Sequence, residues 1–193
     1  KQIHISQPVL LDSDIEKCKN LKNKCFDYAF INCVFEANGE PGSLEKGINA
    51  ICKSAEEAVT SGKKVLILSD KAISKTTAPI PSLLSTGAVH HHLVKLNLRT
   101  RAGIIVQAGD VRETHHYATL IGYGASAVHP YLALQSIEHL QAEGKLDVDI
   151  TIEEATANYQ KAIGYGLLKI LSKMGISTVQ SYQGAQIFEA LGL

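Results

Sequence analysis

Two short, unbroken apolar runs constrain the fold of this chain more than any other feature. They are Lys64–Ser69 (KVLILS) and Gly103–Gln107 (GIIVQ). Runs of this length without alternating polar residues are typical of parallel strands that are covered on both faces. The segments between such runs have the length and periodicity of crossover helices, which predicts right-handed βα units. We therefore expect an α/β fold with about four to five parallel strands, in a barrel-like or an open sheet, followed by extra C-terminal helices.

Capping residues and turn signals place the other elements. A capping box at Thr151 and Glu154 predicts a long helix that runs to about Lys173, and Asp12 or Ser13 is expected to cap the first helix. The predicted strands are Phe26–Phe35, Lys64–Ser69, Gly103–Gln107 and Ala125–His129. The other predicted helices are Asp12–Asn23, Leu44–Ser61 (capped by Ser43), Ile80–Leu98, Arg112–Ile121, Tyr131–Glu143 and Gly184–Leu191.

Composition excludes several classes of partner. At 193 residues, a single domain over residues 1–193 is the simplest organisation. The chain has 19 basic and 19 acidic residues, a balance that argues against a nucleic-acid or membrane surface. It has no Trp and only 6% aromatic residues, so platforms for base stacking are not expected. The apolar runs are too short to span a bilayer. We therefore expect neither nucleic acid nor membrane as a partner.

The N-terminus and the cysteines suggest an intracellular fragment. Lys1–Leu10 lacks the apolar core of a signal peptide, and the chain has no initiator Met, so we expect an excised piece or a processed product. The cysteines show no C-x-x-C spacing, which favours reduced thiols over a metal or iron–sulfur site. These cysteines are Cys18, Cys25, Cys33 and Cys52.

The turn that follows the second apolar run is the first candidate binding site. Ligands of α/β folds bind at the carboxyl ends of parallel strands, where Gly109 would let the backbone approach a phosphate. Arg112 would favour an anion there, whereas Asp110 and Glu113 would repel one. An ordinary βα turn, with Asp110 as the helix cap, is the favoured alternative. Together with His129 at the next strand end, Gly109, Asp110 and Arg112 form a weak candidate pocket.

Histidines between residues 89 and 131 suggest a metal or catalytic site at first sight. Side chains of consecutive helical residues point about 100° apart, so the three neighbouring histidines cannot bind one ion together. No two histidines on one predicted helix are spaced i, i+4, and no Ser-His-Asp or P-loop pattern is present. Hydrogen-bonding roles in the core or at an interface are favoured, and no catalytic or metal-binding residue is assigned. The histidines concerned are His90, His91, His92, His115, His116 and His129.

A glycine pair in the same region also has an ordinary explanation. Gly122-Tyr123-Gly124 follows a predicted helix rather than a strand. A dinucleotide-binding fingerprint needs the order strand, glycines, helix. We therefore interpret these glycines as a helix C-terminal cap.

Three long segments together resemble the central domain of the large subunit of glutamate synthase. They are Val65–Pro81, Ser85–Tyr131 and Lys173–Leu193, and the resemblance extends from about Ile5 to Leu193. Large subunits of this family combine an N-terminal glutamine amidohydrolase domain, the central domain, an FMN-binding barrel with a 3Fe-4S cluster, and a β-helix. They convert glutamine and 2-oxoglutarate, with a reductant, to two glutamates. The chain lacks an N-terminal Cys and a cluster motif, so it resembles only the C-terminal part of the central domain.

The resemblance implies a role as a connecting domain. It implies that this domain is non-catalytic, joins the glutaminase and FMN domains of one chain, and helps form the ammonia path between them. No cofactor is then expected in this fragment, and FMN and the 3Fe-4S cluster belong to the rest of the parent enzyme. The implied location is the cytoplasm, or the plastid in a plant or alga. An isolated fragment is expected to expose apolar surface and could self-associate.

A weaker resemblance suggests how such a domain could have arisen. Leu98–Val128 is similar to a strand–glycine–helix–strand unit of the family's FMN barrel, with Ala108-Gly109-Asp110-Val111 in place of its glycine-rich phosphate turn. This suggests a barrel-like fragment that has lost its cofactor site. The alternative is a stand-alone domain that binds a small ligand or anion at the strand ends near Asp70, Gly109 and His129.

Overall fold

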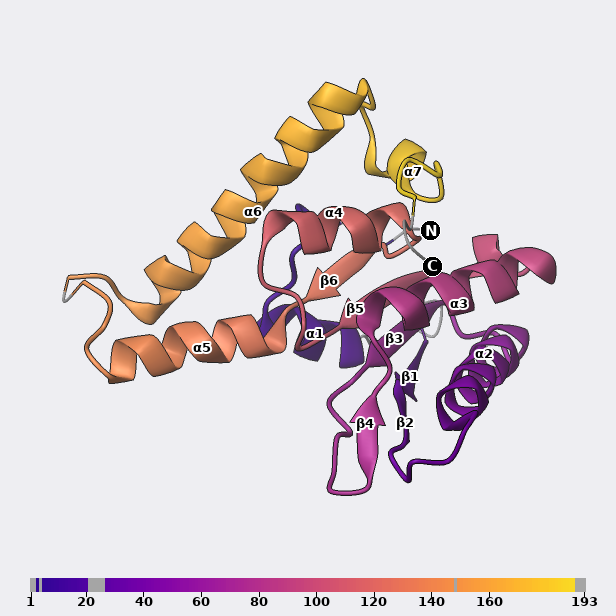
Figure 1. Ribbon diagram of the computed structural model, residues 1–193. Coiled ribbons are helices and arrows are strands. Elements are labelled where there is room, and N and C mark those ends of the chain that lie inside the picture. The colour runs from indigo at the N-terminus through magenta and orange to yellow at the C-terminus, as the bar shows by residue number, and fades with distance from the viewer. Residues whose placement is uncertain (1–2, 4, 21–26, 148, 190–193) are drawn as a thin grey trace.

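Four parallel strands form the centre of the fold in the computed structural model, which describes residues 3, 5–20, 27–147 and 149–189 (Figure 1). They pair in the order β1-β3-β5-β6, so each strand lies beside the next one along the chain. Both apolar runs become central strands, and the predicted α/β class with parallel strands is confirmed. The strands are β1 (Tyr28–Asn32), β3 (Val65–Ser69), β5 (Gly103–Gln107) and β6 (Ala127–His129).

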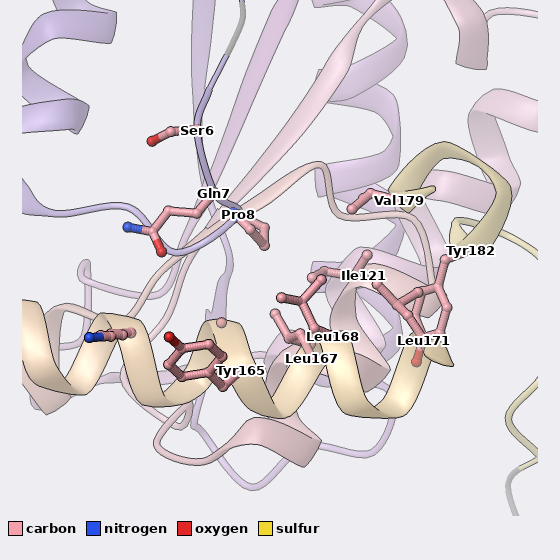
Figure 2. A pocket seen from close by; sticks show the side chains of 12 residues that line it. Ser6, Gln7, Pro8, Ile121, Tyr165, Leu167, Leu168, Leu171, Val179 and Tyr182 are labelled. Carbon is pink, nitrogen blue, oxygen red and sulfur yellow. The ribbon is translucent and has the colours of Figure 1, made fainter. Parts of the chain in front are cut away.

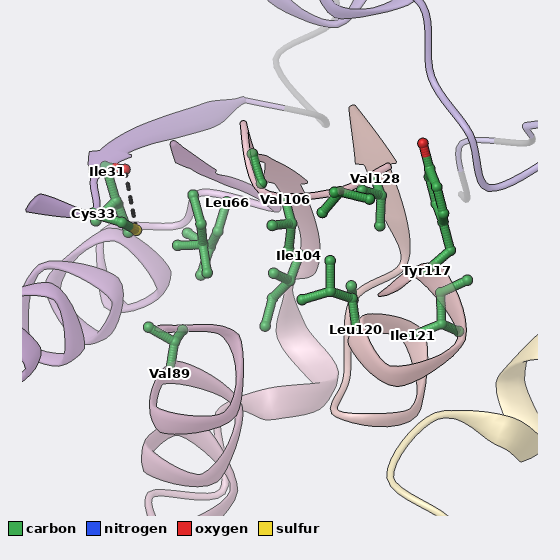
Figure 3. Close-up of a cluster of buried hydrophobic side chains, with 14 of the residues drawn as sticks. Ile31, Cys33, Leu66, Val89, Ile104, Val106, Tyr117, Leu120, Ile121 and Val128 are labelled. Carbon is green, nitrogen blue, oxygen red and sulfur yellow. Dashed lines mark hydrogen bonds between the residues drawn. The ribbon is translucent and has the colours of Figure 1, made fainter. Parts of the chain in front are cut away.

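Three connecting helices cover one face of this sheet. They are α2 (Ser43–Thr60), α3 (Ser82–Lys95) and α4 (Thr114–Gly122). Right-handed crossovers between strands in sequential order place every connecting helix on the same face. The larger hydrophobic core lies between this face and the helices (Figure 3). It includes Leu66, Leu68, Ile104, Val106 and Val128 from the strands, and Val89, Leu120 and Ile121 from the helices.

A short helix, α1 (Asp12–Lys19), packs on the opposite face of the sheet. Ile15 of this helix is 2% exposed. Just before α1, Val9 forms a parallel bridge with Val128 and so extends the sheet beyond β6. This second, smaller core contains Leu10, Ile15, Val65, Ile67, Ile105 and Ala127.

The predicted strand Phe26–Phe35 is two separate strands, so that prediction was wrong in part. β2 (Val34–Glu36) leaves the parallel sheet and pairs antiparallel with β4 (Thr77–Pro79). β1 is an edge strand, which explains why Phe30 is 43% exposed rather than buried. Residue 26 lies outside the described residues.

Three further helices follow the sheet. They are α5 (Tyr131–Ala142), α6 (Ile152–Met174) and α7 (Val179–Tyr182). α6 packs on both α4 and α5, and α7 contacts the C-terminal part of α4 (Figure 1). The predicted capping box is present, because Thr151 accepts a hydrogen bond from the Glu154 N–H and Glu154 accepts one in return. Among the described residues, no helix combines the length and apolar character needed to cross a membrane.

The predicted last helix, Gly184–Leu191, is wrong over its described part. Residues 185–189 are irregular, and 190–193 lie outside the described residues. Gly184 adopts a φ of 70° and donates its N–H to the Gly122 carbonyl at 2.9 Å. This left-handed conformation ends the last turn, and Phe188 then packs over α4.

The remaining helices form where predicted but differ at their ends. α3 begins at Ser82, after Pro81 at its N-cap, and not at Ile80. Leu11, rather than Asp12 or Ser13, occupies the N-cap of α1, and Asp14 accepts its N–H at 3.1 Å. Gly42 occupies the N-cap of α2, and Ser43 is its first residue. α1 ends at Lys19, and predicted residues 21–23 lie outside the described part.

Candidate functional site

A row of polar side chains crosses the carboxyl ends of the central strands. Ser69, Gln107 and His129 are the last residues of β3, β5 and β6, and they lie in register. Their exposed fractions are 1%, 4% and 0%. Folds of this kind bind ligands at the carboxyl ends of their parallel strands, so this row is the main candidate for a functional site.

Hydrogen bonds fix the orientation of this row. The Ser69 hydroxyl donates to Oε1 of Gln107 at 2.8 Å. The Gln107 amide then donates through Nε2 to Nδ1 of His129 at 2.9 Å. Since Nδ1 accepts this bond, the neutral imidazole carries its proton on Nε2. The Ser69 hydroxyl also accepts from the Lys71 N–H at 3.3 Å, whereas Nε2 of His129 has no hydrogen-bond partner among the described residues.

Nε2 of His129 approaches helix α1. It lies 3.2 Å from Oδ1 of Asp12, a contact of a ring nitrogen with a carboxylate oxygen. Burial lowers the pKa of His129 to about 4, the Asp12 carboxylate opposes that shift, and Lys71 and Lys19 add to it. A neutral, fully buried imidazole fits a structural role between α1 and the sheet, because a base that works near neutral pH needs a pKa close to 7.

The chain itself fills the candidate anion site at Gly109. The Gly109 N–H donates to Oδ2 of Asp70 at 2.8 Å, so a carboxylate of the protein takes the bond that a phosphate would need. A Cβ at Gly109 would lie 2.9 Å from the Tyr131 hydroxyl, which shows how closely the two residues pack. The ammonium of Lys71 lies 4.5 Å from the centre of the Tyr131 ring.

The electrostatics of this strand end disfavour an anion. Burial raises the pKa of Asp70, although the hydrogen bond from the Gly109 N–H and the nearby Tyr131 hydroxyl oppose the shift. Burial, with Asp70 nearby, raises the pKa of Tyr131 to about 12, so the hydroxyl stays protonated. A flavin phosphate would meet the Asp70 carboxylate and an N–H that is already bonded. The residues present therefore do not fit a bound FMN phosphate.

The structure separates the four candidate residues. Gly109 and His129 lie at adjacent strand ends, whereas Asp110 accepts the Ser82 N–H at 3.2 Å and so anchors the start of α3. The prediction that Asp110 caps the following helix was wrong, because Glu113 occupies the N-cap of α4. Arg112 is exposed, and its N–H donates to Nδ1 of His116 at 3.1 Å.

Sequence reasoning missed the polar row itself. The sequence predicts only that Asp70 lies near a strand end and that Ser69 and Gln107 end apolar runs. The sequence does contain a signal for this row. In β3, β5 and β6, a run of apolar residues is followed by a single polar residue at the end of the strand. That these residues share one level depends on the register of the sheet, which the sequence does not display.

Two histidines outside this row, His90 and His92, link α3 to neighbouring segments. Nδ1 of His90 accepts from Nε of Arg99 at 3.0 Å, and the same guanidinium donates to the carbonyls of Ala102 and Gly124 at 2.7 Å each. Burial lowers the pKa of His90 to about 4, and Arg99 adds to the shift. Nε2 of His92 lies 3.0 Å from Oε2 of Glu56, which links α3 to α2.

No group of three or more metal-ligating side chains occurs within the residues that the structure describes. Three of the cysteines are free thiols: Cys18, Cys33 and Cys52. Burial raises the pKa of Cys33 to about 12, which makes this thiol a poor nucleophile. Cys25 lies outside the described residues.

Solved structures with a similar fold are TIM-barrel flavoenzymes. A flavocytochrome b2 variant with sulfite bound matches at 15% identity with a TM-score of 0.54, over 91% of this chain and 38% of that chain. A mandelate oxidase variant with an FMN adduct matches at 14% identity with a TM-score of 0.52, over 68% and 37%. Sequential strand order with all connecting helices on one face is the arrangement of half a barrel, so the class is a barrel-like α/β domain.

The whole sequence, residues 1–193, matches the model of the glutamate synthase central domain. The chain belongs to this family, as the resemblance predicted. It is 44% identical over 193 residues to the glutamate synthase [NADPH] large chain of Bacillus subtilis, and 43% identical over 204 residues to the ferredoxin-dependent glutamate synthase of Pyropia yezoensis. All of this chain aligns in both cases, but it spans only 12% and 13% of the length of these relatives.

Proposed function

We propose that this domain is a non-catalytic scaffold of glutamate synthase. In this role it joins the glutamine amidohydrolase and FMN domains of the parent polypeptide and helps form the ammonia path between them. FMN and the 3Fe-4S cluster would be held by other parts of that polypeptide. Its location in the cytoplasm, or in a plastid, stays a prediction, although a relative in Arabidopsis thaliana is described as chloroplastic.

One observation carries the proposal. Where a barrel flavoenzyme would hold an anionic group, the Asp70 carboxylate occupies the Gly109 N–H at 2.8 Å and Tyr131 packs against the glycine. The adjacent His129 is fully buried and bonded within the sheet. These contacts argue against the alternative of a stand-alone anion-binding domain, because an anion would have to displace a carboxylate of the protein.

Substitutions at the strand ends of the full-length parent enzyme test the non-catalytic role. Asp70→Asn and His129→Gln should leave glutamine hydrolysis, and glutamate formation from ammonia and 2-oxoglutarate, within about tenfold of wild type. A lost general acid or base usually costs about 10²–10⁴ in rate. A hundredfold loss of either half-reaction, with unchanged circular dichroism, would overturn the proposal.

The joining role has its own readout in the same enzyme. His90→Ala removes the acceptor of Arg99 and loosens the contact of α3 with Gly124, without touching the strand ends. We expect more glutamine to be hydrolysed for each glutamate formed, with both half-reactions retained. A wild-type ratio in a folded His90→Ala enzyme, with Lys95→Ala on the surface of α3 as the control, would count against the joining role.

A further inference from the structure

A groove of about 360 Å³ opens beside α6, away from the strand ends. Figure 2 shows Ser6–Pro8 along one side, α6 along the other and α7 at one end. Its floor includes Ile121 of α4 and Leu167 of α6. The groove therefore lies where the N-terminal segment, α4, α6 and α7 meet.

The rim of this groove carries the two most exposed large hydrophobic side chains of the described residues. Tyr165 and Leu168, both on α6, are each 63% exposed. They lie three residues apart and so project from one face of the helix. Clustered exposure of this kind, next to a concave apolar surface, is typical of a surface that another part of a protein covers.

We propose that this groove docks an apolar segment of the parent polypeptide that lies outside residues 1–193. The inference rests on the proposed role as a joining domain, and it deepens that role by naming the surface. The segment would place large aliphatic or aromatic side chains between Pro8 and Leu168. A carboxylate of the same segment would lie beside Lys161.

The relatives indicate why the occupant belongs to the same polypeptide. The Bacillus subtilis chain aligns with all of this sequence over 12% of its own length, so most of such a polypeptide lies outside this domain. Ser6–Pro8 and Val179–Tyr182 line the groove and come from the two end regions of the sequence. Flanking polypeptide would thus be tethered beside the groove, at an effective concentration of about millimolar, which a second copy does not match.

Charge specifies one feature of the segment. Among the described residues that line the groove, Lys161 is the only charged one. Its ammonium lies 5.8 Å from the centre of the Tyr165 ring, which holds the charge at the rim. A carboxylate docked there would gain an ion pair at the edge of an apolar contact, the usual arrangement of an interface with a polar rim.

Photo-crosslinking in the full-length parent enzyme tests the docking. Leu168 is replaced by p-benzoylphenylalanine, and isotopically light and heavy enzymes are mixed before irradiation. We expect cross-links to a peptide outside residues 1–193, within chains of one isotopic label. Leu132 on α5, which is 47% exposed, is the matched control and should give little product.

Three outcomes would contradict the docking. They are cross-links that join light and heavy chains, cross-links confined to residues 1–193, and a yield at Leu168 no higher than at Leu132.

A second pair of variants tests the predicted carboxylate beside Lys161. Lys161→Glu should lower the cross-link yield about threefold, as expected for an exposed ion pair. Lys173→Glu, near the end of α6, should leave the yield unchanged. Equal yields in both would overturn the predicted carboxylate.

The docking and the proposed function can fail separately. Leu168→Glu in the parent enzyme should raise the glutamine hydrolysed per glutamate formed if the docked groove also couples the half-reactions. An intramolecular cross-link together with unchanged coupling supports the docking and counts against the joining role. If His90→Ala alters the coupling but Leu168 gives no cross-link, the joining role is supported and the docking is contradicted.

Discussion

At the scale of single residues, burial decides what the histidines and tyrosines do. His90 and His129 have a pKa of about 4, mainly because burial penalises the charged imidazole, so each acts as a neutral hydrogen-bonding group. Two tyrosines are almost completely buried, but only one is satisfied. The Tyr117 hydroxyl lies 2.8 Å from that of Tyr159, whereas the Tyr182 hydroxyl has no hydrogen-bond partner among the described residues.

This contrast predicts that replacing tyrosine by phenylalanine has opposite effects on stability at the two positions. Tyr182→Phe removes a buried, unpaired hydroxyl and should leave the free energy of unfolding unchanged or raise it by about 1 kcal/mol. Tyr117→Phe removes a paired hydroxyl and should lower it by about 1 kcal/mol. Urea denaturation of both variants is the measurement. A larger loss for Tyr182→Phe than for Tyr117→Phe would show that the Tyr182 hydroxyl is bonded.

At the scale of elements, glycines allow two helices to cross closely. Gly166 of α6 faces Thr114 at the start of α4, where an added Cβ would lie 2.5 Å from Cγ2 of the threonine and 3.0 Å from its Cβ. Gly164 lies two residues earlier in α6. A Cβ added there would make only an ordinary contact, at 3.7 Å from Oε1 of Gln7. The tetrapeptide IGYG occurs twice, at Ile121–Gly124 and at Ile163–Gly166. In α6 its last glycine allows a close approach, whereas after α4 its last glycine, Gly124, ends the helix with a φ of 114°.

The two glycines of α6 form a matched test. Gly166→Ala should destabilise the domain by about 1–3 kcal/mol, because the new methyl group overpacks the crossing. Gly164→Ala should be neutral or stabilising by up to about 1 kcal/mol, since alanine favours a helix and space is available. Thermal denaturation compares them, and Thr114→Ala should partly rescue Gly166→Ala. Equal effects of the two glycine substitutions would rule out a close crossing at Gly166.

At the scale of the whole molecule, the sheet has unequal cores on its two faces. α2, α3 and α4 cover one face, while α1 covers the other through a much smaller cluster that includes Ile15. His129 stands at the edge of this smaller core, beside Asp12 of α1. Global stability should therefore depend on the charge state of that imidazole.

Acid should destabilise the domain through this contact. The unfolded chain protonates His129 near pH 6.5 and the folded chain near pH 4, so the unfolded state binds more protons in that interval. Stability is complete above about pH 6.5 and falls by about 3 kcal/mol as the pH approaches 4. His129→Gln should make this loss shallower, whereas His139→Gln on the surface of α5 should not. Urea denaturation at several pH values measures the free energy of unfolding of each protein. If wild type and His129→Gln lose stability equally between pH 6.5 and pH 4, His129 is not the group responsible.

Much of the fold was predictable from local patterns. The runs KVLILS and GIIVQ identified β3 and β5, and the Thr151–Glu154 capping box identified α6, because strand burial and helix capping act over a few residues. Two features were not predictable: the end of β1 at Asn32, before β2, and the irregular conformation of residues 185–189. Cys33 still donates its N–H to the Ser69 carbonyl of β3, but its own carbonyl accepts from the Ile80 N–H, which directs the chain toward β4. Gly184 ends α7 and donates its N–H to the Gly122 carbonyl. These bonds join segments that are far apart in the sequence.

Local patterns and 44% identity to a relative are enough to assign the family, the α/β class and the order of the four parallel strands with their connecting helices. They do not predict the β2–β4 pair or the irregular residues 185–189. What the strand ends can bind depends on contacts between distant parts of the chain. The bond from Gly109 to Asp70 joins residues 39 positions apart, and the row from Ser69 to His129 depends on sheet register. Contacts of this kind depend on how βα units pack, and no local pattern records that packing.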